Sequence, residues 1–515
     1  MTRLNTAIGL SLLYASAYFL NFLNPLTLYF VPSFFDYIVY PSLVTVFCLV
    51  PVILLATSSL PSAGIKRKLM FFGTAAFTLL AIKSAFNAAD YPWGNLVQLI
   101  MPSVFESTNR FGIGKIMLVG ATLAIIFGCL YLTRNDLSKW IRALSTMGYA
   151  FVFLALYRCI ALDFFFQPAA PAAVTPDHAV TTVDRRVVWV IFDEMDYALS
   201  LKPGSGMAAA MPNFSALTAR AISANQAFSP GQDTSYSIPA LLTGTALSGV
   251  TIRSQNRLDL VDQQHKVVRF GPDSAIFSQL PGGPQAATVL GFYHPYCKMF
   301  PSLQSCNSTY AVNAGRWFDS LTFFSTALIS AIKNIKGATR ILPEFVLYHF
   351  DNMYRASDNV LSHLDATLAN QRSSFDFIHM NLPHLPNIYV QRLLKQPVEN
   401  DTDAYRQNLI GADMVLGRVV KDLQALADKQ NILLVVSSDH WLRTHSKQPA
   451  AIPFIVWKVG ASEPIVLPDR ISTVHSKQLV LDFLSGKLDT QPELADTLRR
   501  TPYYETWSAP DGYKF

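Results

Sequence analysis

An apolar run that ends in a cluster of acids constrains the fold of this chain more than any other feature. Residues 187–197 read VVWVIFDEMDY, so a buried-type segment leads directly into Asp193, Glu194 and Asp196. Such a run is typical of a strand buried on both faces of an α/β sheet. Acids at the carboxyl end of the strand lie where open sheets bind ligands. The alternative interpretation is a strand followed by an ordinary helix N-cap.

A second apolar run repeats this design. Residues 432–441, ILLVVSSDHW, end with Asp439 and His440. Because parallel strands deliver the residues that follow them to one edge of a sheet, the two sets of side chains are expected to meet. Carboxylate and imidazole groups brought together are typical metal ligands, so the two runs predict a metal site.

The segments around these runs alternate between strand and helix patterns, which predicts βαβ units and a mainly parallel sheet. The expected strands are at 222–230, 286–297, 375–384 and 451–459, and the expected helices are at 212–221, 343–371 and 403–426. The expected fold class is therefore α/β, with helices on both faces of the sheet.

The first third of the chain is the most apolar part. Hydrophobic residues make up 51% of the 515 residues, and charged residues only 15%. Five segments reach the roughly 20 apolar residues needed to cross a bilayer, and they lie at 7–30, 37–58, 68–87, 114–133 and 143–166. Basic residues such as Arg67 and Arg134 lie between the second and third and between the fourth and fifth segments. The positive-inside rule then predicts a cytoplasmic amino terminus and an outer location for the chain after residue 166.

The expected organisation has two parts. A transmembrane domain with five helices covers 1–166, a linker rich in Pro, Ala and Thr covers 167–186, and an extracytoplasmic α/β domain covers 187–515. The formal charge of +6 comes without a long Lys/Arg-rich tract, which argues against nucleic acid as a partner.

Two of the five cysteines, Cys297 and Cys306, lie in the expected outer domain with eight residues between them. In an oxidising compartment a disulfide is favoured over a metal pair, because no further cysteine there could complete a zinc site. The sequence therefore predicts a Cys297–Cys306 disulfide.

Residues 229–245, SPGQDTSYSIPALLTGT, are dense in hydroxyl groups and are where a nucleophile is expected. Pro239 suits the first turn of a helix that begins ALLTG. A hydroxyl at a helix N-terminus gains from the helix dipole, as does an approaching phosphate. The alternative is an ordinary hydroxyl N-cap, and only the two acid-tipped strands favour a catalytic role over it.

Four motifs in chain order make the outer domain resemble the alkaline phosphatase/sulfatase superfamily. They are IFDE, TSYSIP, LPHLP and SSDH. TSYSIP is similar to the T-x-x-S-x-P of the membrane-bound phosphoethanolamine transferases and lipoteichoic-acid-synthase-like enzymes, and SSDH to the S-D-H of the family. The resemblance covers roughly residues 185–460 and the five-span layout. It implies a sulfatase-like α/β/α sandwich in the periplasm, anchored in a bacterial inner membrane.

The resemblance also implies roles for individual residues. Thr234 becomes the nucleophile, His384 binds the substrate phosphate, and His445 corresponds to a later substrate-site histidine. The implied metal ligands are Glu194, with Asp193 as the alternative, Thr234, Asp439 and His440.

Three other histidines are expected to be less direct participants. His379 is expected to be packed inside a strand, whereas a part in the site stays open for His294 and for His475.

The chain departs from the family pattern in several places. Trp441-Leu442 replaces the usual Gly-Glu after S-D-H, and the first strand ends Asp-Glu rather than Gly-Glu. The C-x-P-x-R or S-x-P-x-R signature of sulfatases, whose Cys or Ser becomes formylglycine, is absent. Sulfate-ester hydrolysis is therefore the weaker interpretation.

Two carboxylates, an imidazole and a threonine oxygen form a donor set that suits zinc, with manganese as the alternative. The leading hypothesis is a metal-dependent transferase acting through a phospho-threonine. It would move a phosphoethanolamine-like or phosphoglycerol-like head group from a membrane phospholipid to an envelope glycan or lipid. One alternative is a phosphodiesterase, phosphatase or sulfuric-ester hydrolase of the same superfamily. Another is an inactive membrane-anchored binding or scaffold protein, although a dead site has no reason to keep all the implied ligands.

Overall fold

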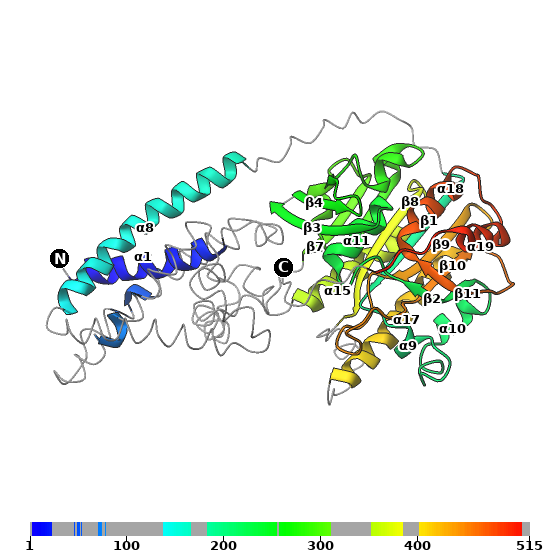
Figure 1. Cartoon of the computed structure of the whole chain (residues 1–515), viewed down its shortest axis with the longest axis horizontal. Helices are drawn as coiled ribbons and strands as arrows, with labels where there is room; N and C mark the ends of the chain where they lie inside the picture. The colour runs from blue at the N-terminus through cyan, green and yellow to red at the C-terminus, as the bar shows by residue number, and fades with distance from the viewer. Residues whose placement is uncertain are drawn as a thin grey trace. The chain divides into compact units, whose positions relative to one another are not determined.

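The computed structural model describes residues 3–22, 137–165, 183–254, 257–310, 352–384 and 401–506, with a few scattered positions between 46 and 78. The chain divides into two compact units (Figure 1). One is formed mostly by residues 1–167, and the other by residues 168–312 and 348–510.

The first unit contains two long helices, α1 (Arg3–Phe22) and α8 (Leu137–Phe165). Their backbones come so close at Gly9 and Gly148 that a Cβ added to Gly148 would lie 1.8 Å from the carbonyl oxygen of Gly9. Among the residues that the structure describes, no helix combines the length and apolar character that crossing a membrane requires. The expected spans at 37–58, 68–87 and 114–133 lie outside the described residues, apart from the scattered positions.

The second unit is built on an eight-stranded sheet with the order β11-β2-β10-β9-β1-β8-β6-β7. Strand β1 lies between β9 and β8 and runs parallel to both, whereas β10 is antiparallel to β9 and β2. The α/β class and the mainly parallel sheet are as the sequence predicts. The strands are β1 (Arg185–Asp193), β2 (Ile222–Phe228), β6 (Ala287–Tyr293), β7 (Ser305–Tyr310), β8 (Phe375–Pro383), β9 (Asn431–Ser438), β10 (Phe454–Lys458) and β11 (Ile465–Ser472).

Helices cover both faces of this sheet. Val188, Val190 and Phe192 of β1 belong to the core formed with α10 (Pro212–Thr218), α15 (Asn352–Ala369) and α17 (Asp401–Gln424). The alternate residues of β1 are also fully buried and point to the other face, where α18 (Ser476–Leu484) packs against β1. Burial on both faces explains the continuous apolar run from Val187 to Phe192 within β1.

The remaining described elements are short. A second, antiparallel sheet contains β3 (Leu247–Ser254), β4 (Arg257–Asp262) and β5 (Val267–Phe270). The other helices are α9 (Tyr197–Ser200), α11 (Thr234–Thr243), α12 (Tyr296–Met299) and α19 (Gln491–Arg500), with 3-10 turns at Ile276–Gln279, Gly283–Ala286 and Thr473–His475.

Helix α11 differs from the expectation drawn from Pro239. It begins at Thr234, and Pro239 lies inside it rather than in its first turn. The helix starts there because the carbonyl of Asp233 accepts a hydrogen bond from the amide of Ser237, 2.9 Å away. Thr234 therefore occupies the first helical position.

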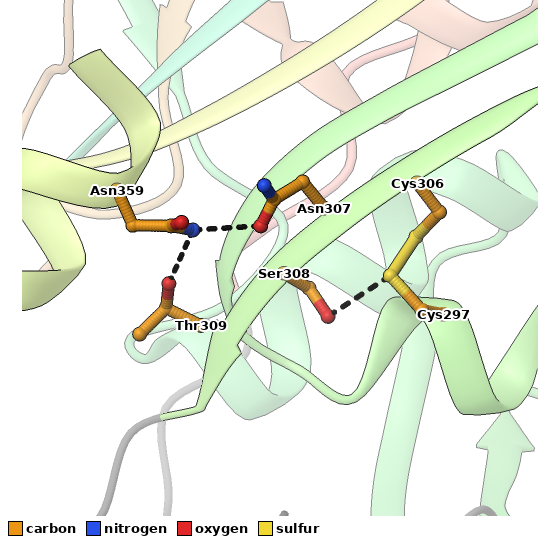
Figure 2. The surroundings of a disulfide bond; sticks show 6 residues. All are labelled: Cys297, Cys306, Asn307, Ser308, Thr309 and Asn359. Atoms are coloured by element: carbon orange, nitrogen blue, oxygen red, sulfur yellow. Dashed lines mark hydrogen bonds between the residues drawn. A yellow bond between two sulfur atoms is a disulfide. The ribbon is translucent and has the colours of Figure 1, made fainter. Parts of the chain in front are cut away.

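A disulfide joins Cys297 of α12 to Cys306 of β7, the pair indicated by the sequence (Figure 2). Ser308 donates a hydrogen bond to the sulfur of Cys297 at 3.3 Å. On the same strand, Asn307 and Thr309 accept hydrogen bonds from Asn359 of α15. These contacts fix the edge of the sheet and the short helix α12 beside it.

Candidate active site

The two acid-tipped strands and the N-terminus of α11 meet at one point. The hydroxyl of Thr234 donates a hydrogen bond of 2.7 Å to Oδ2 of Asp439. It also lies 3.4 Å from Oδ1 of Asp193 and 3.5 Å from Nε2 of His440. All four side chains are buried, so the hydroxyl is held in a pocket of carboxylate and imidazole groups.

Backbone hydrogen bonds hold Asp439 in a single orientation. Its Oδ1 accepts from the amide of Glu194 at 3.0 Å and from the amide of His440 at 2.7 Å. Ser438 adds a second link between the strands, because its hydroxyl donates to the carbonyl of Phe192 at 2.7 Å. Only Oδ2 of Asp439 is left to face Thr234.

The imidazole of His440 presents a lone pair to the acids. Its Nδ1 must donate to the carbonyl of Trp441, 2.9 Å away, because a carbonyl only accepts. Burial, and then the charge of Arg443, lower the pKa of His440 to about 3, so the ring is neutral at pH 7. The bare Nε2 lies 3.5 Å from both Asp193 and Asp439. The imidazole therefore offers the two carboxylates a lone pair and not a hydrogen-bond donor.

The surroundings of Asp193 oppose its negative charge. Burial raises the pKa of its carboxyl well above the usual range, and the nearby Asp439 and Glu194 raise it further. Buried carboxylates this close together stay ionised only when a cation compensates them. The donor set of oxygen and neutral imidazole nitrogen therefore fits a divalent metal ion.

His379 of β8 belongs to the same centre. Its ring, Asp193 and Asp439 each offer one ligand atom, and these three atoms lie within 4.8 Å of one another. Nδ1 of His379 lies 3.0 Å from the hydroxyl of Tyr296. Burial lowers the pKa of His379 to about 4, which keeps this ring neutral too. His379 is packed inside β8 as the sequence predicts, but that prediction did not include its proximity to the acids.

Glu194 lies beside this centre but contacts other groups. Its backbone has a left-handed φ of 64°. Its carboxylate lies 3.4 Å from Nε2 of His384 and 3.4 Å from Nε of Arg443. The structure therefore places the carboxylate of Asp193, and not that of Glu194, in contact with Thr234.

The other histidines named by the sequence fall in different places. His294 is fully buried, and its Nε2 donates to the carbonyl of Thr234 at 3.0 Å. His445 is exposed. Burial raises the pKa of Asp196, and the charge of His445 opposes this shift by a smaller amount. His475 hydrogen-bonds the carbonyl of Pro502 at 2.7 Å. Only His294 of these three is seen to touch Thr234.

Arg443 is the site residue that sequence reasoning overlooked. It follows the apolar run of β9 by five residues, so its position at the carboxyl edge of the sheet was the available signal. Its charge acts on Asp193, Asp233 and His440.

Comparison with known proteins identifies the class. The sequence pattern of the Sulfatase family matches residues 185–490, which is more than half of the chain. The chain therefore belongs to the sulfatase family, within the alkaline phosphatase/sulfatase superfamily, and is an enzyme of that superfamily. No curated protein matches the sequence.

Several solved structures are similar to this chain at low identity. Ps i-CgsB, solved with k-i-k-neocarrahexaose, is 15% identical with a TM-score of 0.41, covering 60% of this chain and 74% of its own. The lipoteichoic acid synthase LtaP from Listeria monocytogenes is 13% identical with a TM-score of 0.38, covering 63% and 77%. The soluble domain of lipooligosaccharide phosphoethanolamine transferase A from Neisseria meningitidis is 14% identical with a TM-score of 0.38, covering 61% and 91%.

Proposed function

We propose that the protein is a metal-dependent transferase that moves a phosphorylated head group through a phospho-threonine at Thr234. The carrying observation is the hydroxyl of Thr234, which lies 2.7 Å from Asp439 at the first position of the ten-residue helix α11. A threonine cannot become the formylglycine of sulfatases, so a directly phosphorylated hydroxyl suits this site better than sulfate-ester hydrolysis.

The residues that would hold the metal ion are Asp193, Asp439 and His440, with the oxygen of Thr234 as a fourth ligand. His379, whose ring offers a nitrogen within 4.8 Å of the ligand atoms of Asp193 and Asp439, is a further candidate ligand. This set suits zinc, with manganese as the alternative. When bound, the ion supplies Lewis acidity, which lowers the pKa of the threonine hydroxyl and offsets charge on the transferring group. Glu194, the ligand that the resemblance implies beside Asp193, stays a candidate ligand, and its carboxylate lies 3.4 Å from His384 and from Arg443.

The side chains account for the proton and the bonds in each step. Thr234 gives its proton to Asp439 and its oxygen forms a bond to phosphorus, while the bond from phosphorus to the lipid oxygen breaks. The leaving alkoxide takes a proton from His384, whose ring is partly exposed. An acceptor hydroxyl then loses its proton to His384, and its oxygen forms a bond to phosphorus while the bond from phosphorus to the Thr234 oxygen breaks. Thr234 takes its proton back from Asp439, which restores the hydroxyl.

The proposed substrates suit the setting that the sequence predicts for the domain. The apolar first third supports anchorage in a bacterial inner membrane with the catalytic domain in the periplasm, and a membrane phospholipid is then a nearby donor. The Cys297–Cys306 disulfide is in keeping with an oxidising compartment. The acceptor would be a hydroxyl of an envelope glycan or lipid.

The test combines metal content, intact mass and lipid products. Wild type, Thr234→Ala, Asp439→Asn and the control Thr245→Ala are purified in detergent and given vesicles of phosphatidylethanolamine or phosphatidylglycerol. We expect near-stoichiometric zinc or manganese in wild type and in Thr245→Ala, and a metal deficit in Asp439→Asn. A phosphoryl adduct and diacylglycerol should form in wild type and be absent from Thr234→Ala.

Two results would overturn the transferase proposal. Diacylglycerol released with an equal amount of free phosphorylated head group, even when glycan and lipid acceptors are present, would identify a hydrolase. Wild-type protein that contains no metal and resists loading would instead support a binding or scaffold role.

A further inference from the structure

Arg443 carries a positive charge into a site dominated by acids. Asp193, Glu194, Asp233 and Asp439 all act electrostatically on its guanidinium. Partial burial lowers the pKa of Arg443, but these four acids together raise it by more. Arg443 is therefore permanently charged in the same group of side chains that holds Thr234.

The guanidinium is anchored along one edge only. Nε of Arg443 and its own backbone amide each lie 3.4 Å from Oε1 of Glu194. In the described part of the chain, neither terminal nitrogen of the guanidinium has a hydrogen-bond partner, and 42% of the side chain is exposed. Glu194 thus orients the planar group, and the side chain of Arg443 stays partly exposed.

An arginine held in this way matches the geometry of a phosphoryl or sulfuryl oxygen pair. The segment after the nucleophile, SYSIP, contains no Arg or Lys, so a basic side chain that contacts the substrate would have to come from another part of the fold. The same glutamate also contacts His384 at 3.4 Å through its other oxygen. Glu194 therefore contacts both Arg443 and His384.

We propose that Arg443 is a substrate-binding residue whose two terminal nitrogens grip the anionic oxygens of the group attacked by Thr234, with Glu194 as its positioning residue. This inference rests on the proposed function for the identity of the group. It applies to any oxyanion ester that reaches Thr234, and its ligand class is the phosphate monoanion or dianion.

The experiment compares Arg443→Met and Arg443→Lys with Arg418→Met. Arg418 is the matched control, because its side chain is also 42% exposed and also paired with one acid, Asp365 of α15. Each full-length protein is loaded with zinc and checked for metal content. Binding of inorganic phosphate is measured by calorimetry, and hydrolysis of bis(4-nitrophenyl) phosphate is measured by its kcat and KM.

Loss of one charge-assisted donor pair should weaken phosphate binding in Arg443→Met by about tenfold or more. It should also lower kcat/KM by about 100-fold, with normal metal content. Arg443→Lys should recover part of both losses, and Arg418→Met should behave as wild type. Phosphate binding in Arg443→Met equal to that of Arg418→Met, or loss of the metal from Arg443→Met, would overturn the inference.

Failure of the proposed function gives a different pattern. If wild type never forms the Thr234 adduct but binds phosphate through Arg443, the anion site is supported and the transferase proposal is wrong. If wild type transfers the head group while Arg443→Met binds phosphate normally, only the proposed role of Arg443 is wrong. If zinc-loaded wild type neither binds phosphate nor turns over the ester, both proposals are wrong.

Discussion

The backbone amide of Glu194 donates a hydrogen bond of 3.0 Å to Oδ1 of Asp439, which lies 245 residues further along the chain. This bond joins the ends of the neighbouring strands β1 and β9. It depends on the left-handed φ of 64° at Glu194, a conformation that non-glycine residues rarely adopt. Because Oδ1 is occupied by amides, Asp439 has one free oxygen, and that oxygen receives Thr234.

Asp439→Asn should separate folding from function. The asparagine oxygen can still accept from the amides of Glu194 and His440, so we expect a folded protein with a Tm within a few degrees of wild type. The amide nitrogen would face Thr234 and cannot bind a metal ion, so activity should fall by about three orders of magnitude or more. Circular dichroism melts and ester hydrolysis on the same samples measure the two effects.

The matched variant is Asp439→Leu. It leaves two buried amides unpaired and should cost about 2–4 kcal/mol of unfolding free energy in addition to activity. Equal stability of the Leu and Asn variants would show that the amide bonds to Oδ1 do not hold the strand ends together.

Asp193→Asn should stabilise the metal-free protein at neutral pH while it inactivates the enzyme. The pKa of Asp193 is raised above its ordinary value of 3.8, chiefly by burial and then by Asp439 and Glu194. The folded state therefore holds its proton more tightly than the unfolded state, and stability is lost as pH rises from 3.8 through the raised pKa. Above that window the variant avoids the cost of a buried charge, which is about 1–3 kcal/mol.

Thermal melts of metal-free wild type and Asp193→Asn at pH 4 and pH 7.5 check this sign. The gain of the variant should shrink at pH 4, where Asp193 is protonated in wild type. Saturating zinc should reverse the order, because only wild type keeps the full ligand set. A variant that is less stable than metal-free wild type at pH 7.5 would contradict the account of Asp193.

The main elements of the site could be predicted from sequence because each has a local signal. The apolar runs that become β1 and β9 end in acids, and parallel neighbours necessarily bring those ends together. The choice between Asp193 and Glu194 had no such signal. Both are adjacent acids at the end of one strand, and the φ of Glu194 decides which carboxylate faces Thr234.

Other parts of the fold were invisible for different physical reasons. The segment 465–472, IVLPDRIS, forms the edge strand β11, where a proline and charges are tolerated but hide the strand pattern. The small sheet of β3, β4 and β5 depends on antiparallel pairing between segments of weak alternation. The contact of His379 with Tyr296 depends on α12, which lies 83 residues away in the chain and follows a different strand.

Removing one partner of the buried pair Arg186–Asp376 should strongly destabilise the catalytic unit. Nε of Arg186 donates to Asp376 at 2.7 Å, and both side chains are fully buried. The other guanidinium nitrogens donate to the carbonyls of Leu368 and Thr367 at the end of α15. Arg186→Met leaves a buried carboxylate unpaired and should cost about 3–5 kcal/mol.

Urea unfolding of single and double variants measures this coupling. Arg186→Met with Asp376→Leu should recover much of the loss, because no charge is then left buried. The exposed pair Arg418–Asp365 is the control, and Arg418→Met should cost under about 1 kcal/mol. A double variant as unstable as the sum of the two singles would show that the two charges are not coupled.

Replacing Cys297 and Cys306 with serine should lower stability and leave catalysis largely intact. The bond closes a short loop between α12 and β7, and the chain-entropy relation gives about 2–3 kcal/mol for a loop of this size. Tyr296, next to Cys297, is fully buried and has ring contacts with His294, Phe377 and His379. Because this packing holds Tyr296 without the disulfide, kcat at 25 °C should stay within about threefold of wild type.

Melting curves of the double serine variant, with and without a reductant, test the stability effect, and wild type under reductant should approach the variant. Hydrolysis rates below the melting transition test the effect on catalysis. A loss of kcat beyond about tenfold in the fully folded variant would mean that the disulfide positions the site. Such a loss corresponds to about 1.4 kcal/mol of activation free energy, which loop closure alone does not explain. In that case Tyr296→Phe should reproduce the loss, since it removes the hydroxyl that contacts His379 and keeps the ring packing.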